Sequence, residues 1–143
     1  FTLDDFRAVL AAAGRAQVKG VLRDQKILAG IGNAYSDEIL HAARLSPFKP
    51  ANSLDEAASA ELFGHLRDVL GRAVAAAAEV PIAQLKDAKR AGMRVHGRTG
   101  EACEVCGGVI AEVSFADSSL QYCPGCQTGG KPLADRRMSR LLK

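Results

Sequence analysis

The 143-residue sequence has no long apolar run, no internal repeat and no cysteine before residue 103. The first absence excludes a membrane-spanning helix, which needs about 20 consecutive apolar residues. No signal-peptide pattern opens the chain, and the scarcity of cysteine is typical of a cytosolic protein whose thiols stay reduced. We therefore expect a cytoplasmic protein with no membrane partner.

The four cysteines that are present form two hooks near the end of the chain. Two residues separate Cys103 from Cys106 and Cys123 from Cys126, and residues 107–122 lie between the hooks. Two such hooks can close a tetrahedral zinc site, and the glycines beside them let backbone amides turn toward the sulfurs. The sequence predicts one structural Zn²⁺ held by all four thiolates. A pair of disulfides or a redox Cys-x-x-Cys is the alternative.

Helical patterns fill the rest of the chain. Thr2 reads as a helix cap, Gly14 as a stop, and Ser53 with Glu56 as a capping box for a long helix. The spacing predicts helices over residues 2–14, 19–28, 34–43, 53–78 and 81–90, and strands over 110–113 and 120–122. The expected fold is mainly α, a helical bundle followed by a small β-hairpin zinc ribbon. We expect a helical domain over 1–92, a four-cysteine zinc finger over 93–130 and a basic tail over 131–143.

The break between two helical segments, Gly30-Ile31-Gly32-Asn33, is a candidate anion site. Its two glycines permit a sharp reversal, and the next helix then begins with unpaired amides at the positive end of its dipole. Asn33 could donate its side-chain amide to the same anion. Alternatively, Asn33 only caps its own helix.

A polyanionic partner would have to meet a local basic patch. The formal net charge is +3, and a zinc centre with four thiolates would offset about two of these charges. Residues 15–49 and the tail after Lys131 are both rich in lysine and arginine. Either segment could equally be an ordinary solvated surface.

Two motifs carry a family resemblance over nearly the whole chain. They resemble the helix-two-turn-helix domain and the zinc finger of formamidopyrimidine-DNA glycosylases and endonuclease VIII. The matching residues are Lys19-x-x-Leu22-x-Asp24-Gln25, Gly30-Ile31-Gly32-Asn33-x-Tyr35-x-x-Glu38-x-Leu40, Pro47, Val95-His96-Gly97-Arg98-x-Gly100-Glu101-x-Cys103 and Tyr122-Cys123-Pro124-x-Cys126-Gln127.

The resemblance implies a set of DNA contacts. Asn33, in the turn of Gly30 and Gly32, would bind the phosphates that flank a damaged nucleotide. Lys19 would lie on the damage-facing side, or be an ordinary surface lysine. His96 and Arg98 could contact backbone phosphate or merely pack and cap. These residues would grip a bent duplex while a base is flipped out.

The sequence departs from the family in three places. The family's N-terminal proline nucleophile and its neighbouring glutamate have no counterpart near Phe1, so this chain alone should not excise bases. At the hairpin tip Ser118 stands where the family usually carries an arginine, which predicts a weaker phosphate contact or a different base preference. The tail continues past Gln127, where the family commonly ends, and would be a packed helix or a mobile arm.

The leading hypothesis is the damaged-DNA-binding C-terminal portion of a bifunctional glycosylase and abasic-site lyase of base excision repair, either a fragment or a shortened relative. We expect it to be a nucleoid-associated monomer that prefers damaged or abasic double-stranded DNA. The alternative is a stand-alone, non-catalytic zinc-ribbon protein that binds nucleic acid. A ribosome-associated protein is a third class, against which the zinc ribbon argues.

Overall fold

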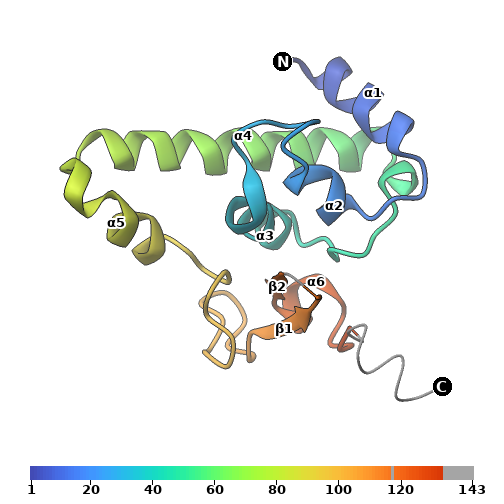
Figure 1. Cartoon of the computed structure of the whole chain (residues 1–143). Helices are drawn as coiled ribbons and strands as arrows, with labels where there is room; N and C mark the ends of the chain where they lie inside the picture. The colour runs from blue at the N-terminus through green and yellow to red at the C-terminus, as the bar shows by residue number, and fades with distance from the viewer. Residues whose placement is uncertain (117, 134–143) are drawn as a thin grey trace.

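The computed structural model describes residues 1–116 and 118–133 (Figure 1). It confirms the predicted fold class, a mainly α-helical bundle followed by a β-hairpin ribbon. No helix in this part of the chain is long and apolar enough to cross a membrane. In chain order the elements are α1 (Leu3–Ala13), α2 (Val18–Arg23), α3 (Gly32–Ala43), the 3-10 helix η1 (Ala51–Ser53), α4 (Glu56–Ala78), the 3-10 helix η2 (Ile82–Gln84), α5 (Leu85–Ala91), β1 (Ala111–Ser114), β2 (Ser119–Tyr122) and α6 (Pro124–Gln127).

Local capping signals set where α1 and α4 begin. Thr2 and Asp5 form a reciprocal capping box, because each side chain accepts a hydrogen bond from the other residue's amide. The predicted capping box at Ser53 is wrong. Ser53 belongs to η1, where its hydroxyl donates to a carbonyl of the same turn, and Asp55 caps α4 by accepting from the Ala58 amide at 2.7 Å. Asp55 stands directly before the first helical residue, Glu56, and therefore takes the N-cap position in place of Ser53.

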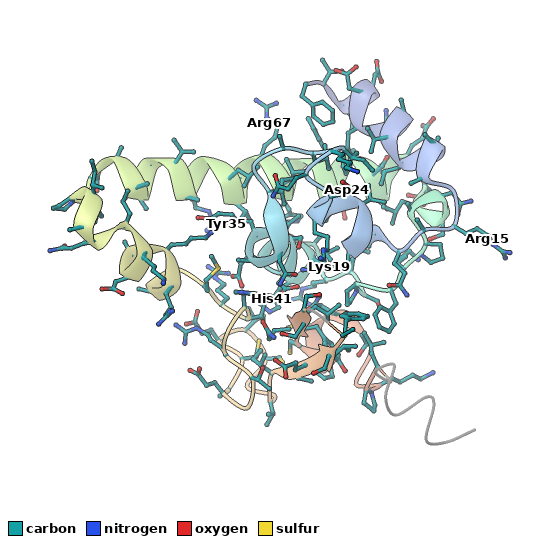
Figure 2. All side chains as sticks on the ribbon, viewed as in Figure 1. Arg15, Lys19, Asp24, Tyr35, His41 and Arg67 are labelled. Atoms are coloured by element: carbon teal, nitrogen blue, oxygen red, sulfur yellow. The ribbon has the colours of Figure 1, made fainter. Side chains whose placement is uncertain are left out.

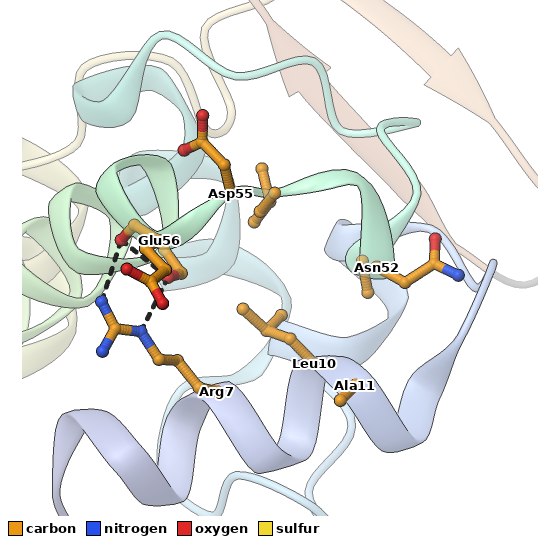
Figure 3. A pocket seen from close by; sticks show the side chains of 9 residues that line it. Arg7, Leu10, Ala11, Asn52, Asp55 and Glu56 are labelled. Carbon is orange, nitrogen blue, oxygen red and sulfur yellow. Dashed lines mark hydrogen bonds between the residues drawn. The ribbon is translucent and has the colours of Figure 1, made fainter.

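Arg7 fastens α1 to the start of α4. Its Nε donates to Ser59 Oγ at 3.1 Å, and its Nη2 donates to the Glu56 carbonyl at 3.0 Å. These bonds lie beside a cavity of about 240 Å³ between the two helices (Figure 3). The guanidinium thus donates to two oxygens in the first turn of α4 and joins α1 to α4 by hydrogen bonds.

The main hydrophobic core packs α1, α2 and α3 against the first half of α4. A fully buried Leu, Ile, Val or Phe side chain contributes roughly 1.5–3 kcal/mol. Every buried member of this core precedes residue 67, so the helical domain has a core of its own without the ribbon. The buried members are Phe6, Leu10, Val18, Val21, Leu22, Leu28, Ile31, Ile39, Leu40, Ala51, Leu62, Phe63 and Leu66.

The turn before α3 adopts the predicted reversal. Gly30 has φ 92° and Gly32 has φ 66°, values in the left-handed region that favours glycine. The helix before the turn is shorter than predicted, because α2 ends at Arg23 rather than near residue 28. The chain then reaches α3 through a short irregular segment, in which the Asp24 carboxylate accepts from the Lys26 amide.

The ribbon packs against α3 on the side away from α4 (Figure 1). Strands β1 and β2 are antiparallel, with Ala111 opposite Tyr122, close to the predicted positions. Val113, Leu120 and Tyr122 form a small core beneath them. The Leu133 amide donates to the Tyr122 hydroxyl at 2.7 Å, so the start of the tail is fixed to the hairpin. The remainder of the tail, on which the helix-or-arm prediction depends, lies outside the described residues.

Candidate metal centre and nucleic-acid interface

The four cysteines converge on one point, as their spacing predicts. One ligand atom from each lies within 4.8 Å of all the others. The Sγ atoms of Cys103 and Cys126 are 3.8 Å apart, and those of Cys106 and Cys123 are 3.3 Å apart. A tetrahedral site with Zn–S bonds of about 2.3 Å requires separations of about 3.8 Å. The thiol set therefore fits one Zn²⁺, and the disulfide alternative is wrong because all four thiols are free.

Backbone amides prepare two of the sulfurs for the metal. The Val105 amide donates to Cys103 Sγ and the Gly108 amide donates to Cys106 Sγ, both at 3.4 Å. The Gly108 bond lowers the pKa of Cys106 to about 7, whereas burial raises the pKa of Cys123. Since zinc binds thiolates, binding would release the protons of those thiols that are still protonated.

A contact from the helical domain reaches the metal centre. His41, buried near the end of α3, places Nε2 3.5 Å from Cys103 Sγ. Figure 2 shows His41 and Lys19 between the helices and the ribbon. An imidazole that hydrogen-bonds a thiolate fixes the sulfur from outside the ligand set. The motifs in the sequence did not predict this role, although His41 lies four residues after Asp37 and eight after Asn33, on one face of α3.

Asn33 connects α3 to the hairpin rather than capping its own helix. Helix α3 begins one residue before it, at Gly32, and the N-cap position is Ile31, which has no side-chain capping bond. The Asn33 Nδ2 instead donates to the Ser119 carbonyl at 3.0 Å, while its Oδ1 is buried without a hydrogen-bond partner among the described residues. The capping interpretation is therefore wrong. The Gly30 amide of the same turn is taken by the Gln25 side chain.

Lys19 is buried, which overturns its interpretation as a surface lysine. Only 4% of the residue is exposed. Its ammonium donates to the Asn33 carbonyl at 2.8 Å, to Ser36 Oγ at 2.5 Å and to Asp37 Oδ1 at 2.6 Å. Burial lowers the pKa of Lys19, and the attraction of the Asp37 carboxylate opposes that shift. All three donors of the ammonium are occupied within the protein, so Lys19 supports the first turn of α3 from below.

Asp37 and Glu38 attach the ribbon to α3. Asp37 accepts from the Gln121 amide at 3.1 Å and bonds His96 Nδ1 at 2.8 Å, in addition to Lys19. Glu38 accepts three consecutive backbone amides, those of Arg94, Val95 and His96, at 2.6–2.9 Å. These two buried carboxylates thus hold the segment that enters the ribbon. The family motif contained Glu38, but no local signal in the sequence assigned it this partner.

The other predicted contact residues differ in how far the protein itself uses them. Arg98 donates from Nε to the Met93 carbonyl at 2.6 Å and pairs with Glu101, which agrees with a packing role. The His96 side chain is 28% exposed. Ser118 accepts a hydrogen bond from Arg23 Nη1 at 3.1 Å. An arginine therefore does stand at the hairpin tip, but it comes from α2.

Comparisons with known proteins match both halves of the chain. Residues 1–82 match the family model described as the formamidopyrimidine-DNA glycosylase H2TH domain, and residues 100–129 match the zinc finger found in FPG and IleRS. A formamidopyrimidine-DNA glycosylase-like protein of Mycobacterium tuberculosis is 56% identical over 97% of this chain and 88% of its own length. The formamidopyrimidine-DNA glycosylase of Sphingopyxis alaskensis is 43% identical over 87% of this chain and 49% of its own. The chain thus spans about half the length of that glycosylase.

Solved structures agree with this match. The MutM (Fpg) protein of Thermus thermophilus superposes with a TM-score of 0.77 at 36% identity, over 92% of this chain and 51% of that one. The Lactococcus lactis Fpg in complex with DNA that contains an abasic site superposes with a TM-score of 0.76 at 30% identity, over 90% and 48%.

Proposed function

Because this chain belongs to the formamidopyrimidine-DNA glycosylase family, we propose that it binds duplex DNA, preferentially at damaged or abasic sites. The observation that carries the proposal is the bond between Asn33 at the start of α3 and Ser119 of the hairpin. It joins the helix-two-turn-helix turn and the finger tip into one surface. The Lactococcus lactis relative, which has the same fold over this region, is complexed with such DNA.

Asn33 is the central phosphate contact in this proposal. Its side-chain amide has two N–H groups, of which one donates to Ser119 and leaves the other for a phosphate oxygen. Ser118 would offer its hydroxyl, and Arg23 beside it would supply the positive charge that the serine lacks. The Gly30–Gly32 turn would let the DNA strand approach the protein backbone closely. His96 lies at the edge of the same surface. Lys19 and Arg98 serve as internal supports.

We further propose that these residues bind without excising a base. The helix-two-turn-helix domain and the finger account for most of the sequence. Neither carries the N-terminal proline nucleophile and the neighbouring glutamate with which the family performs its chemistry. The base-excision activity of the longer relatives would then belong to the part of those proteins that this chain does not match. The bound form would be a monomer on the nucleoid in the cytoplasm.

One comparison favours a second candidate, a stand-alone non-catalytic DNA-binding protein. The Mycobacterium tuberculosis relative has little sequence outside the region that this chain matches. A related protein of similar extent therefore exists, in which lesion binding rather than excision would be the function. The two candidates share the DNA-binding surface and differ only in whether a catalytic domain accompanies it.

The test is a gel shift with an abasic-site duplex and an intact duplex, followed by borohydride trapping and intact-mass measurement. We expect tighter binding to the abasic duplex and no trapped adduct. Asn33→Ala should weaken binding about tenfold, the effect of one lost hydrogen bond to a charged group, with little change in salt dependence because no charge is removed. An adduct would make the chain a lyase in its own right. Absence of duplex binding would overturn the proposal.

A further inference from the structure

A cavity of about 540 Å³ opens between the first turn of α3, α5 and the segment that enters the ribbon. Its lining includes Ala34, which follows Asn33 directly, and His96, which Asp37 holds by Nδ1. Three cations of α5, Lys86, Lys89 and Arg90, line the opposite wall. Helix α5 returns from the far end of α4 toward the ribbon (Figure 1), and the shared lining brings its cations close to the first turn of α3. We call this space the α5 cavity.

The charges of the α5 cavity are not balanced by the protein. Lys86, Lys89 and Arg90 are spaced i, i+3 and i+4, which places them on one helix face, where like charges repel. Within residues 1–116 and 118–133 none of the three forms an ion pair. Asp87, the one acidic residue of α5, is not among the residues that line the cavity. An anion in the cavity would relieve the repulsion.

One of the cations is held in place toward α3. The Lys89 ammonium lies 4.6 Å from the centroid of the Tyr35 ring, a cation–π contact. Tyr35 is two residues from Asn33, so this contact positions the wall of the cavity relative to the start of α3. The contact therefore holds the Lys89 ammonium beside the proposed DNA surface.

We propose that the α5 cavity is a second phosphate-binding site, which takes a phosphodiester group of the strand that Asn33 contacts. The inference rests on the proposed function and adds to it a specific set of charges, Lys86, Lys89 and Arg90. Asn33 and Ser118 offer hydrogen bonds but no charge, and Arg23 supplies a single charge, so the three cations of α5 would supply much of the salt-dependent part of the affinity. No motif in the sequence predicted a DNA contact on this helix.

The experiment measures duplex affinity as a function of salt for the full chain and three variants. Each cation that neutralises a phosphate should contribute about 1 to the slope of log K against log salt. We expect Lys86→Ala to lower the slope by about 1 and the Lys86→Ala, Arg90→Ala double variant by about 2. Arg67→Ala is the matched control, because Arg67 is exposed and lies on the side of α4 away from the ribbon (Figure 2). It should leave the slope unchanged.

The outcomes separate this inference from the proposed function. Wild-type binding with an unchanged slope in the double variant, at unchanged melting temperature, would overturn the α5 site and leave DNA binding standing. Wild-type protein without duplex binding would overturn both. A titration of the protein with inorganic phosphate is an additional test. Saturation that depends on Lys86 and Arg90, together with an unchanged DNA slope, would make the cavity a site for free phosphate and reject the phosphodiester assignment.

Discussion

At the scale of single residues, the position of Lys19 changes the expected effect of its substitution. The ammonium lies in a buried cluster with Asp37, whose side chain is only 1% exposed, and with two further oxygen acceptors. A lysine in this position cannot also neutralise a phosphate without breaking its buried bonds to these three acceptors. Its role is to hold the Asn33 carbonyl and the first turn of α3 in place.

We therefore expect Lys19→Met to destabilise the protein without altering the salt dependence of DNA binding. Removing one partner of a buried ion pair costs about 3–5 kcal/mol. The Asp37 carboxylate keeps its bonds to Gln121 and His96, so a loss of about 3 kcal/mol, at the lower end of that range, is expected from urea denaturation. Lys26→Met, on an exposed loop residue, is the control for stability. A salt slope lowered by about 1 with unchanged stability would instead return Lys19 to the DNA surface.

At the scale of secondary structure, α3 connects the two domains. Asn33, Asp37 and His41 lie one turn apart along one face, and each contacts the ribbon. The apolar residues of the opposite face, Ile39 and Leu40 among them, enter the helical core. Helix α3 is thus amphipathic in an unusual sense, since its polar face is buried against a second domain rather than exposed to solvent.

Glu38 allows this connection to be tested. Glu38→Ala would leave the amides of Arg94, Val95 and His96 without their acceptor. We expect a loss of about 2 kcal/mol, since an unsatisfied buried donor costs about 1–3 kcal/mol, and faster hydrogen exchange at these three amides. Glu61→Ala, an exposed position on α4, should change stability by less than about 0.5 kcal/mol. Unchanged exchange at residues 94–96 would show that the carboxylate does not order this segment.

At the scale of the whole molecule, the sequence predicted what depends on local patterns. The four-cysteine centre, the glycine reversal before α3 and the order of helices and strands all follow from spacings of a few residues. The docking of the two domains does not. The Asn33–Ser119 bond joins residues 86 apart, and the His41–Cys103 contact joins residues 62 apart. Such pairings depend on how finished elements pack, which is why the sequence predicts neither the bond from Asn33 to the hairpin nor the buried position of Lys19.

Zinc removal should therefore affect both domains, but unequally. The ribbon has only small apolar clusters, and about 40 residues with so small a core do not fold without a metal or disulfides. The main core contains no ribbon residue, so the helical domain should stay folded at about 25 °C. It would nevertheless lose the partners of Asn33, Asp37, Glu38 and His41, and its melting temperature should fall.

The measurement is a melting curve by circular dichroism in the far ultraviolet, with hydrogen exchange, in the presence of a strong chelator. We expect loss of exchange protection in β1 and β2, retained helical signal at room temperature and a lower melting temperature for the helices. Restored zinc is the control and should reverse all three changes. Melting that is indifferent to the chelator would refute a structural metal. Loss of exchange protection in the ribbon without a shift in the melting temperature of the helices would support a structural metal but reject the coupling through α3. Buried carboxylates that lose their hydrogen-bond donors must destabilise the helix that carries them.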